Sequence, residues 1–249
     1  VQYFNWVDGL AHGDLGRSFF TNKSVMGQLA KRIPISLKLA GFSMILTIVF
    51  GVGFGVLMAV KKDRMLDHVL GTFSTAALSV PGFWIAIVLI FLFAEQWKLL
   101  PSSGISGGSG FILPAVTLAL PSIGVCARLP RSAILDEIGR QYMTVADAKG
   151  MSRRHAVICH AFGNALIPII TYLGNHMAGI IGGASIVETI FAIPGIGSYA
   201  IAGVQSKDYY VVQAYVLFSG CIYVLTNILI DLIYIALDPK IRAGEAVES

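Results

Sequence analysis

Charged residues are scarce in this chain of 249 residues. Asp, Glu, Lys and Arg together make up only 13% of it, about half the fraction usual in soluble domains. Hydrophobic residues make up 55%, and the mean hydropathy is +0.74. Repeated long apolar runs with so few charges exclude an ordinary soluble domain. The composition therefore predicts an integral membrane protein.

Motifs for metal, nucleotide and hydrolytic chemistry are also missing. The three cysteines, Cys126, Cys159 and Cys221, are far apart and lie in or beside apolar runs, so we interpret them as small buried hydrophobic side chains. The chain has no GxxxxGK[ST] phosphate loop, no HExxH and no GxSxG. "PGIG" at 194–197 resembles half of a dinucleotide motif but has no βαβ context. We therefore expect no enzyme activity, and any nucleotide chemistry must come from a partner.

Five apolar runs are long enough, or nearly so, to cross a ~30 Å hydrocarbon core, which takes roughly 20 helical residues. We predict an all-α, polytopic membrane helix bundle with natural kink sites at Pro81 and Pro168 and close helix packing at the glycines of 51–55. The third run can extend through Arg128 and Arg131, whose long side chains can snorkel. The runs are 39–60, 69–94, 111–127, 165–193 and 211–237.

Basic residues alternate between the loops. They are dense in 61–64, in 128–154 and after 237, whereas Lys98 and Lys207 are alone in the loops between. The positive-inside rule puts the three dense groups, including the C-terminus, in the cytoplasm. The basic residues of 31–38 oppose this assignment, but the downstream alternation outweighs them. Residues 1–38 then lie outside the cytoplasm with no preceding segment to export them, so we expect a further N-terminal span and six spans in all.

One polar segment interrupts the apolar pattern: "YMTVADAKGMSRRHAVICHAFGNALIP" at 142–168. Gly150 suits a left-handed helix C-cap, and Ser152 suits the N-cap of a following helix. The segment is thus predicted to be a short helix, a corner and a second helix. It can be a solvated loop that binds anionic lipid, or a handle on which a cytoplasmic partner pushes.

Eight short segments stand out in order along the chain. They are "HGDLGRSF" at 12–19, "SVPGFW" at 79–84, "ILPAVTLAL" at 112–120, "ADAKGMSRR" at 146–154, "HAFGNALIP" at 160–168, "ETIFAIPGIG" at 188–197, "KDYYVVQ" at 207–213 and "DPKIR" at 238–242. Together they resemble a known family, the permease subunits of the dipeptide/oligopeptide/nickel branch of ATP-binding-cassette importers.

The resemblance implies a type I importer permease fold with six spans, formed by a single domain over residues 1–249. It also implies alternating access driven through a coupling helix in the cytoplasmic loop 140–160. The sequence departs from the family at Asp147, where Arg is usual, and at Tyr210, where Pro is usual. The residues that we assign to ATPase coupling are Tyr142, Thr144, Ala146, Asp147, Ala148, Lys149, Gly150, Arg153 and Arg154.

Partners also follow from the resemblance. They are a second homologous permease subunit, two ATPase subunits that bind ATP and Mg²⁺, an extracytoplasmic binding protein and membrane lipid, with no nucleic acid and no cofactor in this chain. The location implied is a bacterial inner membrane. Peptides are the expected substrate. Nickel or a metal chelate is the alternative, because some nickel-type members carry a histidine like His176.

Polar groups within apolar runs are candidates for the translocation path or a gate, because their burial is costly. For Asp231 we favour a packing hydrogen bond with Asn227 or a neighbouring span. For Glu188 we expect a structural or gating role at the outer mouth. For His176 a packed core histidine is favoured over a substrate contact. An ion-coupled transporter could use the carboxylates, but no internal repeat is apparent.

The charge alternation makes a testable prediction about topology. Single cysteines at 98 and 207, in a cysteine-free background, should react with an impermeant thiol reagent added outside intact cells. A cysteine at 149 should react only after the membrane is opened. Outside labelling at 149 would overturn the assignment.

Overall fold

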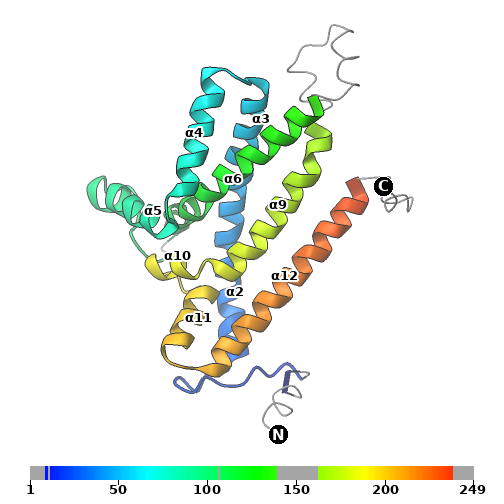
Figure 1. The fold of residues 1–249 in the computed structure, drawn as a ribbon. Helices are drawn as coiled ribbons and strands as arrows, with labels where there is room; N and C mark the ends of the chain where they lie inside the picture. The colour runs from blue at the N-terminus through cyan, green and yellow to red at the C-terminus, as the bar shows by residue number, and fades with distance from the viewer. Residues whose placement is uncertain (1–8, 11, 106, 139–161, 238–249) are drawn as a thin grey trace. The chain divides into compact units, whose positions relative to one another are not determined.

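The computed structural model describes residues 9–10, 12–105, 107–138 and 162–237. Within these ranges the chain is helical, apart from turns and one isolated bridge between Arg17 and Ser24, so the predicted all-α architecture is confirmed (Figure 1). The elements are α2 (Val25–Leu46), η1 (Thr47–Val52), α3 (Gly53–Val60), α4 (Met65–Ser79), α5 (Gly82–Leu89), η2 (Ile90–Gln96), η3 (Gly108–Phe111), α6 (Ile112–Ile138), α9 (Phe162–Gly183), α10 (Ser185–Ile190), α11 (Ile196–Gln205) and α12 (Tyr209–Leu237).

Two predicted spans are longer than expected. The first begins at Val25 and continues through α2, the π-helical η1 and α3 to Val60, over 36 residues. The third covers Gly108–Ile138, and α6 extends through both arginines, as the sequence predicts. With Tyr209–Ala236, these are the three described helices that are long and apolar enough to cross a membrane on their own.

The second predicted span is bent. α4 and the helix Gly82–Gln96 meet at an angle of 102°. Between them Val80 is extended, with φ −92° and ψ 127°, because a residue before proline is disfavoured in the α region and Pro81 has no N–H to donate. The kink at Pro81 is confirmed, and it divides the predicted run 69–94 between two helices. Counted as one span, the bent pair makes a fourth crossing.

The fourth predicted span is interrupted. α9 ends at Gly183, and its apolar part, Leu166–Ile181, is shorter than the three long helices. Consecutive glycines at 182 and 183 have low helix propensity and favour an end there. The chain then forms α10, a turn and α11. A single span over 165–193 is therefore wrong, and Glu188 belongs to a short helix of its own.

The chain divides into two compact units, and α2, α6, α9 and α12 contribute residues to both. The first unit comprises Val1–Phe42, Gly82–Leu118 and Ala178–Val224. The second comprises Ser43–Pro81, Ala119–Met177 and Leu225–Ser249.

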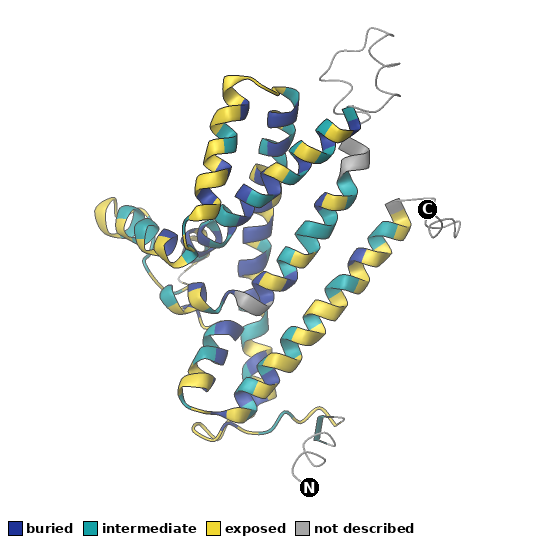
Figure 2. Ribbon diagram, in the orientation of Figure 1, coloured by how far each residue is buried: buried dark blue, intermediate teal, exposed yellow. Residues whose placement is uncertain are grey.

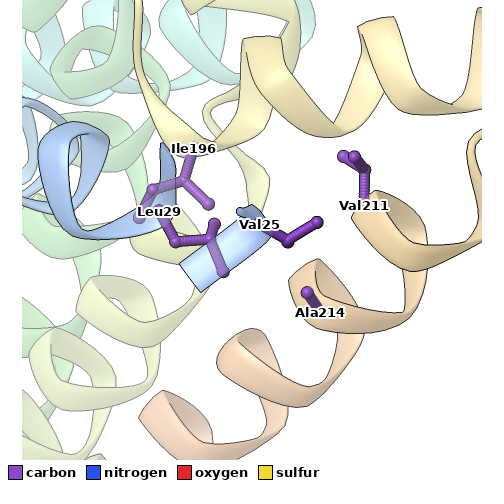
Figure 3. Close-up of a cluster of buried hydrophobic side chains, with 5 residues drawn as sticks. All are labelled: Val25, Leu29, Ile196, Val211 and Ala214. Carbon is purple, nitrogen blue, oxygen red and sulfur yellow. The ribbon is translucent and has the colours of Figure 1, made fainter. Parts of the chain in front are cut away.

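The core of the first unit is an aliphatic cluster in which α2, α11 and α12 meet. Figure 3 shows the five side chains converging from these helices. Each has an exposed fraction of 5% or less, so the cluster excludes water. Its members are Val25, Leu29, Ile196, Val211 and Ala214.

The second unit packs α3, α6 and α9 around Ala59, Ile134 and Ile169. α3 and α4 lie antiparallel beside each other across a tight turn (Figure 1). Small residues allow the helices to approach closely, because a Cβ added at Gly55 would lie 2.6 Å from the Ala127 carbonyl oxygen.

The glycines of 51–55 differ in their surroundings. A Cβ at Gly51 would lie 2.7 Å from the Cβ of Cys126, whereas a Cβ at Gly53 would meet nothing within 4 Å. Close packing is thus confirmed for Gly51 and Gly55 but not for Gly53. The reason is helical geometry, since residues four apart share a face and the residue between them points away.

Exposure differs along the helices, as Figure 2 shows. Only 6% of the most apolar window of α12 is buried within the chain, against 67% for the window in Gly108–Ile138. Cys126 in α6 is buried as predicted, whereas Cys221 in α12 is exposed and contradicts the prediction. The third cysteine, Cys159, lies outside the described residues.

The glycine contacts predict opposite effects for two neighbouring substitutions. Gly55→Ala should lower the free energy of unfolding by about 1–3 kcal/mol, because a backbone carbonyl must move to admit the methyl group. Gly53→Ala, in open space on the same helix, should be neutral or stabilising by up to about 1 kcal/mol. Thermal unfolding of the purified protein in detergent measures both. Equal melting temperatures for the two variants would contradict the packing.

Candidate functional site

A buried carboxylate lies in the first unit where α2, α10 and α11 meet. Glu188 in α10 is 1% exposed, and Ser36 in α2 is 2% exposed. The backbone of Glu188 also takes part in the following turn, because the N–H of Ile193 donates to its carbonyl oxygen at 2.7 Å. The side chain and backbone of one residue therefore both hold the α10–α11 connection.

The carboxylate completes the N-terminus of α11, whose first backbone N–H groups have no partner within the helix. Ser198 N–H donates to Glu188 Oε2 at 2.9 Å, and Ile196 N–H donates to Ser36 Oγ at 2.9 Å. Ser36 Oγ–H in turn donates to Glu188 Oε1 at 2.6 Å. A negative charge at this helix end is favourable because the helix dipole is positive there. We call these four residues the Glu188 cluster.

The glycines of "PGIG" are explained by this geometry. A Cβ at Gly195 would collide with the Glu188 carboxylate, so the carboxylate occupies the space that a side chain would need. A Cβ at Gly197 would lie 2.6 Å from the Cα of Ser185 in α10. The motif therefore serves close helix packing in a turn between two helices, and a nucleotide role is not required to explain it.

Arg32 lies beside the Glu188 cluster. Its guanidinium carbon is 4.5 Å from the centre of the Tyr199 ring, which is a cation–π distance. Its Nε is buried and has no hydrogen-bond partner among the described residues. Burial raises the pKa of the Tyr199 phenol, which therefore stays neutral at physiological pH. Arg32 also interacts electrostatically with Glu188, so a cation accompanies the buried carboxylate.

A second polar contact of the first unit joins the N-terminal segment to the start of α12. Ser18 Oγ donates to Asp208 Oδ2 at 2.6 Å, and both residues are buried. Tyr210 packs against Phe19 with ring centres 5.0 Å apart, and its ring leaves no room for a Cβ at Gly16, where φ is +82°. Tyr210, which stands where the family usually has Pro, thus packs this segment against α12.

His176 lies on α9 in the second unit. Its ring stacks on Tyr172, with centres 5.6 Å apart and planes 4° apart, and Nδ1 is 3.5 Å from Ser122 Oγ. Nε2 is buried and has no hydrogen-bond partner among the described residues. The ring is packed, as a core histidine would be, but one ring nitrogen is left unpaired.

Residues 51–243 match the sequence pattern of a family described as the inner membrane component of binding-protein-dependent transport systems. The chain belongs to this family. It is a multi-pass membrane protein and a component of a transport system.

Individual relatives match nearly the whole chain. The probable peptide ABC transporter permease protein y4tP of Sinorhizobium fredii is 38% identical over 97% of this chain and 80% of its own length. The probable D,D-dipeptide transport system permease protein DdpB of Escherichia coli is 34% identical over 98% and 80%. The oligopeptide transport system permease protein OppB of Haemophilus influenzae is 34% identical over 97% and 80%.

Solved structures support the fold. The MetNI methionine ABC transporter in an inward-facing conformation has a TM-score of 0.71 at 17% identity, and the match covers 86% of this chain and 97% of that one. An amino acid ABC transporter with histidines has a TM-score of 0.67 at 17% identity, covering 83% and 92%. The predicted ABC importer permease fold is thus confirmed.

Two groups of predicted site residues are not joined to these clusters. Asp231 lies on an exposed face of α12, so its packing hydrogen bond stays a prediction. All the residues assigned to ATPase coupling, from Tyr142 to Arg154, lie outside the described residues. The structure places the ends of the two helices that flank them, α6 at Ile138 and α9 at Phe162.

Sequence reasoning missed three polar residues that the fold brings together with others. Ser36 has no motif to mark it, because its partners are 152 and 160 residues away. Asp67 and Arg131 form an ion pair at 2.8 Å. The sequence suggested that the Arg131 side chain snorkels towards the membrane surface. In the structure it is instead paired with Asp67. The position of Arg131 within an apolar helix was the one signal in the sequence that it needs a partner.

The Glu188 cluster predicts a graded loss of stability. Glu188→Ala should lower the free energy of unfolding by about 1–3 kcal/mol, because it leaves the buried Ser36 Oγ–H without an acceptor. The half-buried Ser198 N–H also loses its acceptor and adds a smaller loss. Glu188→Gln retains one acceptor oxygen and should cost less. Thr189→Ala is the control, since Thr189 is exposed and donates only within its own helix. Thermal unfolding in detergent measures the series, and a Glu188→Ala variant as stable as the control would refute the role.

Proposed function

We propose that this chain is the permease subunit of an ATP-driven importer and that it passes di- and oligopeptides delivered by an extracytoplasmic binding protein. The observation that carries the proposal is the likeness to permeases named for peptide transport, at 34–38% identity over 97–98% of the chain. The family description itself specifies dependence on a binding protein.

The work is divided among subunits. A second homologous permease completes the path, and two ATPase subunits bind ATP and Mg²⁺, because this chain has no phosphate loop. The C-terminus and the loop 140–160 face the cytoplasm, as the distribution of basic residues favours. This chain contributes the route and the moving helices.

Coupling is assigned to residues 142–150. Ala146 and Ala148 are small and let an ATPase surface approach closely, and Gly150 supplies a corner that a β-branched residue would strain. Closure of the ATPase pair on ATP would push this segment, which connects α6 to α9 in the chain. The spans then switch between inward- and outward-facing arrangements.

The Glu188 cluster has a supporting role in this cycle. It ties α10 and α11 to α2 through buried hydrogen bonds of 2.6–2.9 Å. We assign it to holding these segments together as one block at the outer mouth.

Nickel or a metal chelate is the second candidate cargo. His176 is the residue that supports it, because its Nε2 is buried and unpaired among the described residues. The described residues contain no group of three or more His, Cys, Asp or Glu side chains that could hold a metal ion. His176 would therefore act at most as a passing contact for the metal.

The proposal is tested in proteoliposomes that contain both permeases, both ATPases and the binding protein. Uptake of a labelled dipeptide should require internal ATP and should not be supported by an ion gradient alone. Competition by unlabelled dipeptide but not by nickel identifies the cargo class. Uptake driven by the gradient without ATP would refute the importer assignment.

Substitutions in the coupling segment should uncouple the complex. Gly150→Val or Ala148→Trp should abolish both uptake and substrate-stimulated ATP hydrolysis, because the coupling segment would no longer fit the ATPase surface. The subunit should still insert into the membrane. Gly108→Val is the matched control, since a Cβ there meets nothing within 4 Å. Lys98→Ala controls for loss of an exposed charge. Wild-type uptake by both coupling variants would show that 142–150 is not the coupling segment.

A further inference from the structure

Asp67 and Arg131 form a bidentate ion pair in the second unit. Arg131 Nε–H donates to Asp67 Oδ1 and Nη2–H donates to Oδ2, both at 2.8 Å. The backbone N–H of Asp63 also donates to Oδ2 at 3.0 Å. Asp67 is 4% exposed, whereas the Arg131 side chain is 34% exposed. A fork of this kind fixes both distance and direction, which a single charge contact does not.

The pair joins the first turn of α4 to α6 near its end. Arg131 precedes the end of α6 at Ile138 by about two helical turns. Next to the pair, Ile134 of α6 packs with Ala59 of α3 and Ile169 of α9. The helices that flank residues 139–161, α6 before them and α9 after them, therefore pack together in the unit that contains the ion pair.

Glycines make part of the contact between α6 and the α3–α4 hairpin. A Cβ at Gly124 would lie 2.6 Å from the Ser74 carbonyl oxygen, as one at Gly55 would lie 2.6 Å from that of Ala127. At these points dispersion holds the helices close, and a glycine has no side chain that could interlock with the neighbouring helix. The directional bonds of the Asp67–Arg131 pair add a contact that opposes sliding along the helix axis.

We propose that Asp67 and Arg131 are positioning residues for energy coupling: the pair makes α4 follow the end of α6, so that movement of the segment 139–161 reaches the α3–α4 hairpin. This inference rests on the proposed role of 142–150 in coupling. Neither residue contacts substrate or nucleotide in this assignment. Their effect is on how much transport each hydrolysed ATP produces.

The experiment measures dipeptide uptake per ATP hydrolysed by the reconstituted complex, normalised to the amount of assembled complex. Asp67→Asn keeps the shape but removes the charge, and should lower this ratio by about 2- to 30-fold, the range expected for residues on a coupling path. Arg131→Lys keeps the charge but loses the fork, so its loss should be smaller. Asp67→Glu, which keeps a carboxylate, should recover part of the ratio lost in Asp67→Asn.

Arg128→Gln is the matched control. Arg128 lies on the same face of α6 and donates to Thr75 Oγ1 at 2.6 Å in an exposed hydrogen bond, and it has no ionic partner among the described residues. Its loss should leave uptake per ATP unchanged. Arg131→Lys also keeps the test informative if Asp67→Asn fails to assemble.

Three outcomes decide the matter. A lowered ratio in assembled Asp67→Asn and Arg131→Lys complexes, with the control unchanged, supports the proposal. Wild-type ratios in both, or uptake and hydrolysis that fall together with the amount of complex, overturn it and leave a purely structural pair. Absence of ATP-dependent uptake by the wild-type complex instead refutes the proposed function.

Discussion

Close approach of helix backbones at glycines is the constraint on which the packing within each unit depends. In a membrane, an apolar side chain gains little by exchanging contacts with lipid for contacts with a neighbouring helix. Helix association therefore relies on dispersion and hydrogen bonds at short range. Gly51, Gly55 and Gly124 provide such contacts in the second unit, and Gly195 and Gly197 provide them in the first. At each of these positions a single methyl group would force a neighbour to move.

Each unit also contains a buried carboxylate that bonds to several segments. In the first, Glu188 accepts from Ser36 and Ser198 and completes the N-terminus of α11. In the second, Asp67 accepts from Arg131 and Asp63. Burial of a carboxylate costs less when its oxygens accept hydrogen bonds, and these bonds fix the positions of several segments at once. The two differ in their partners, because one has neutral donors with a nearby cation and the other has a guanidinium fork.

This difference suits the two jobs of an importer permease. The Glu188 cluster holds two short helices and the turn between them in a fixed arrangement. A bidentate pair beside the helix that leads into residues 139–161, to which we assign coupling by proposal, is placed to pass movement between elements. Small-residue contacts alone would keep these helices close but would leave their relative slide poorly controlled. A directional ion pair such as Asp67–Arg131 limits this sliding and occupies only a small part of the apolar contact surface.

The sequence by itself determined the membrane class, the all-α architecture, the family and the kink at Pro81, because composition, hydropathy and motifs are local properties of the chain. It did not reveal that the run 165–193 is interrupted after Gly183, since an apolar run does not show where consecutive glycines end a helix. Only the tertiary structure decided that Ser36 faces Glu188 and that Arg131 pairs with Asp67. These partners lie 152 and 64 residues apart, and a contact over such a distance depends on how the helices pack, which no local pattern encodes.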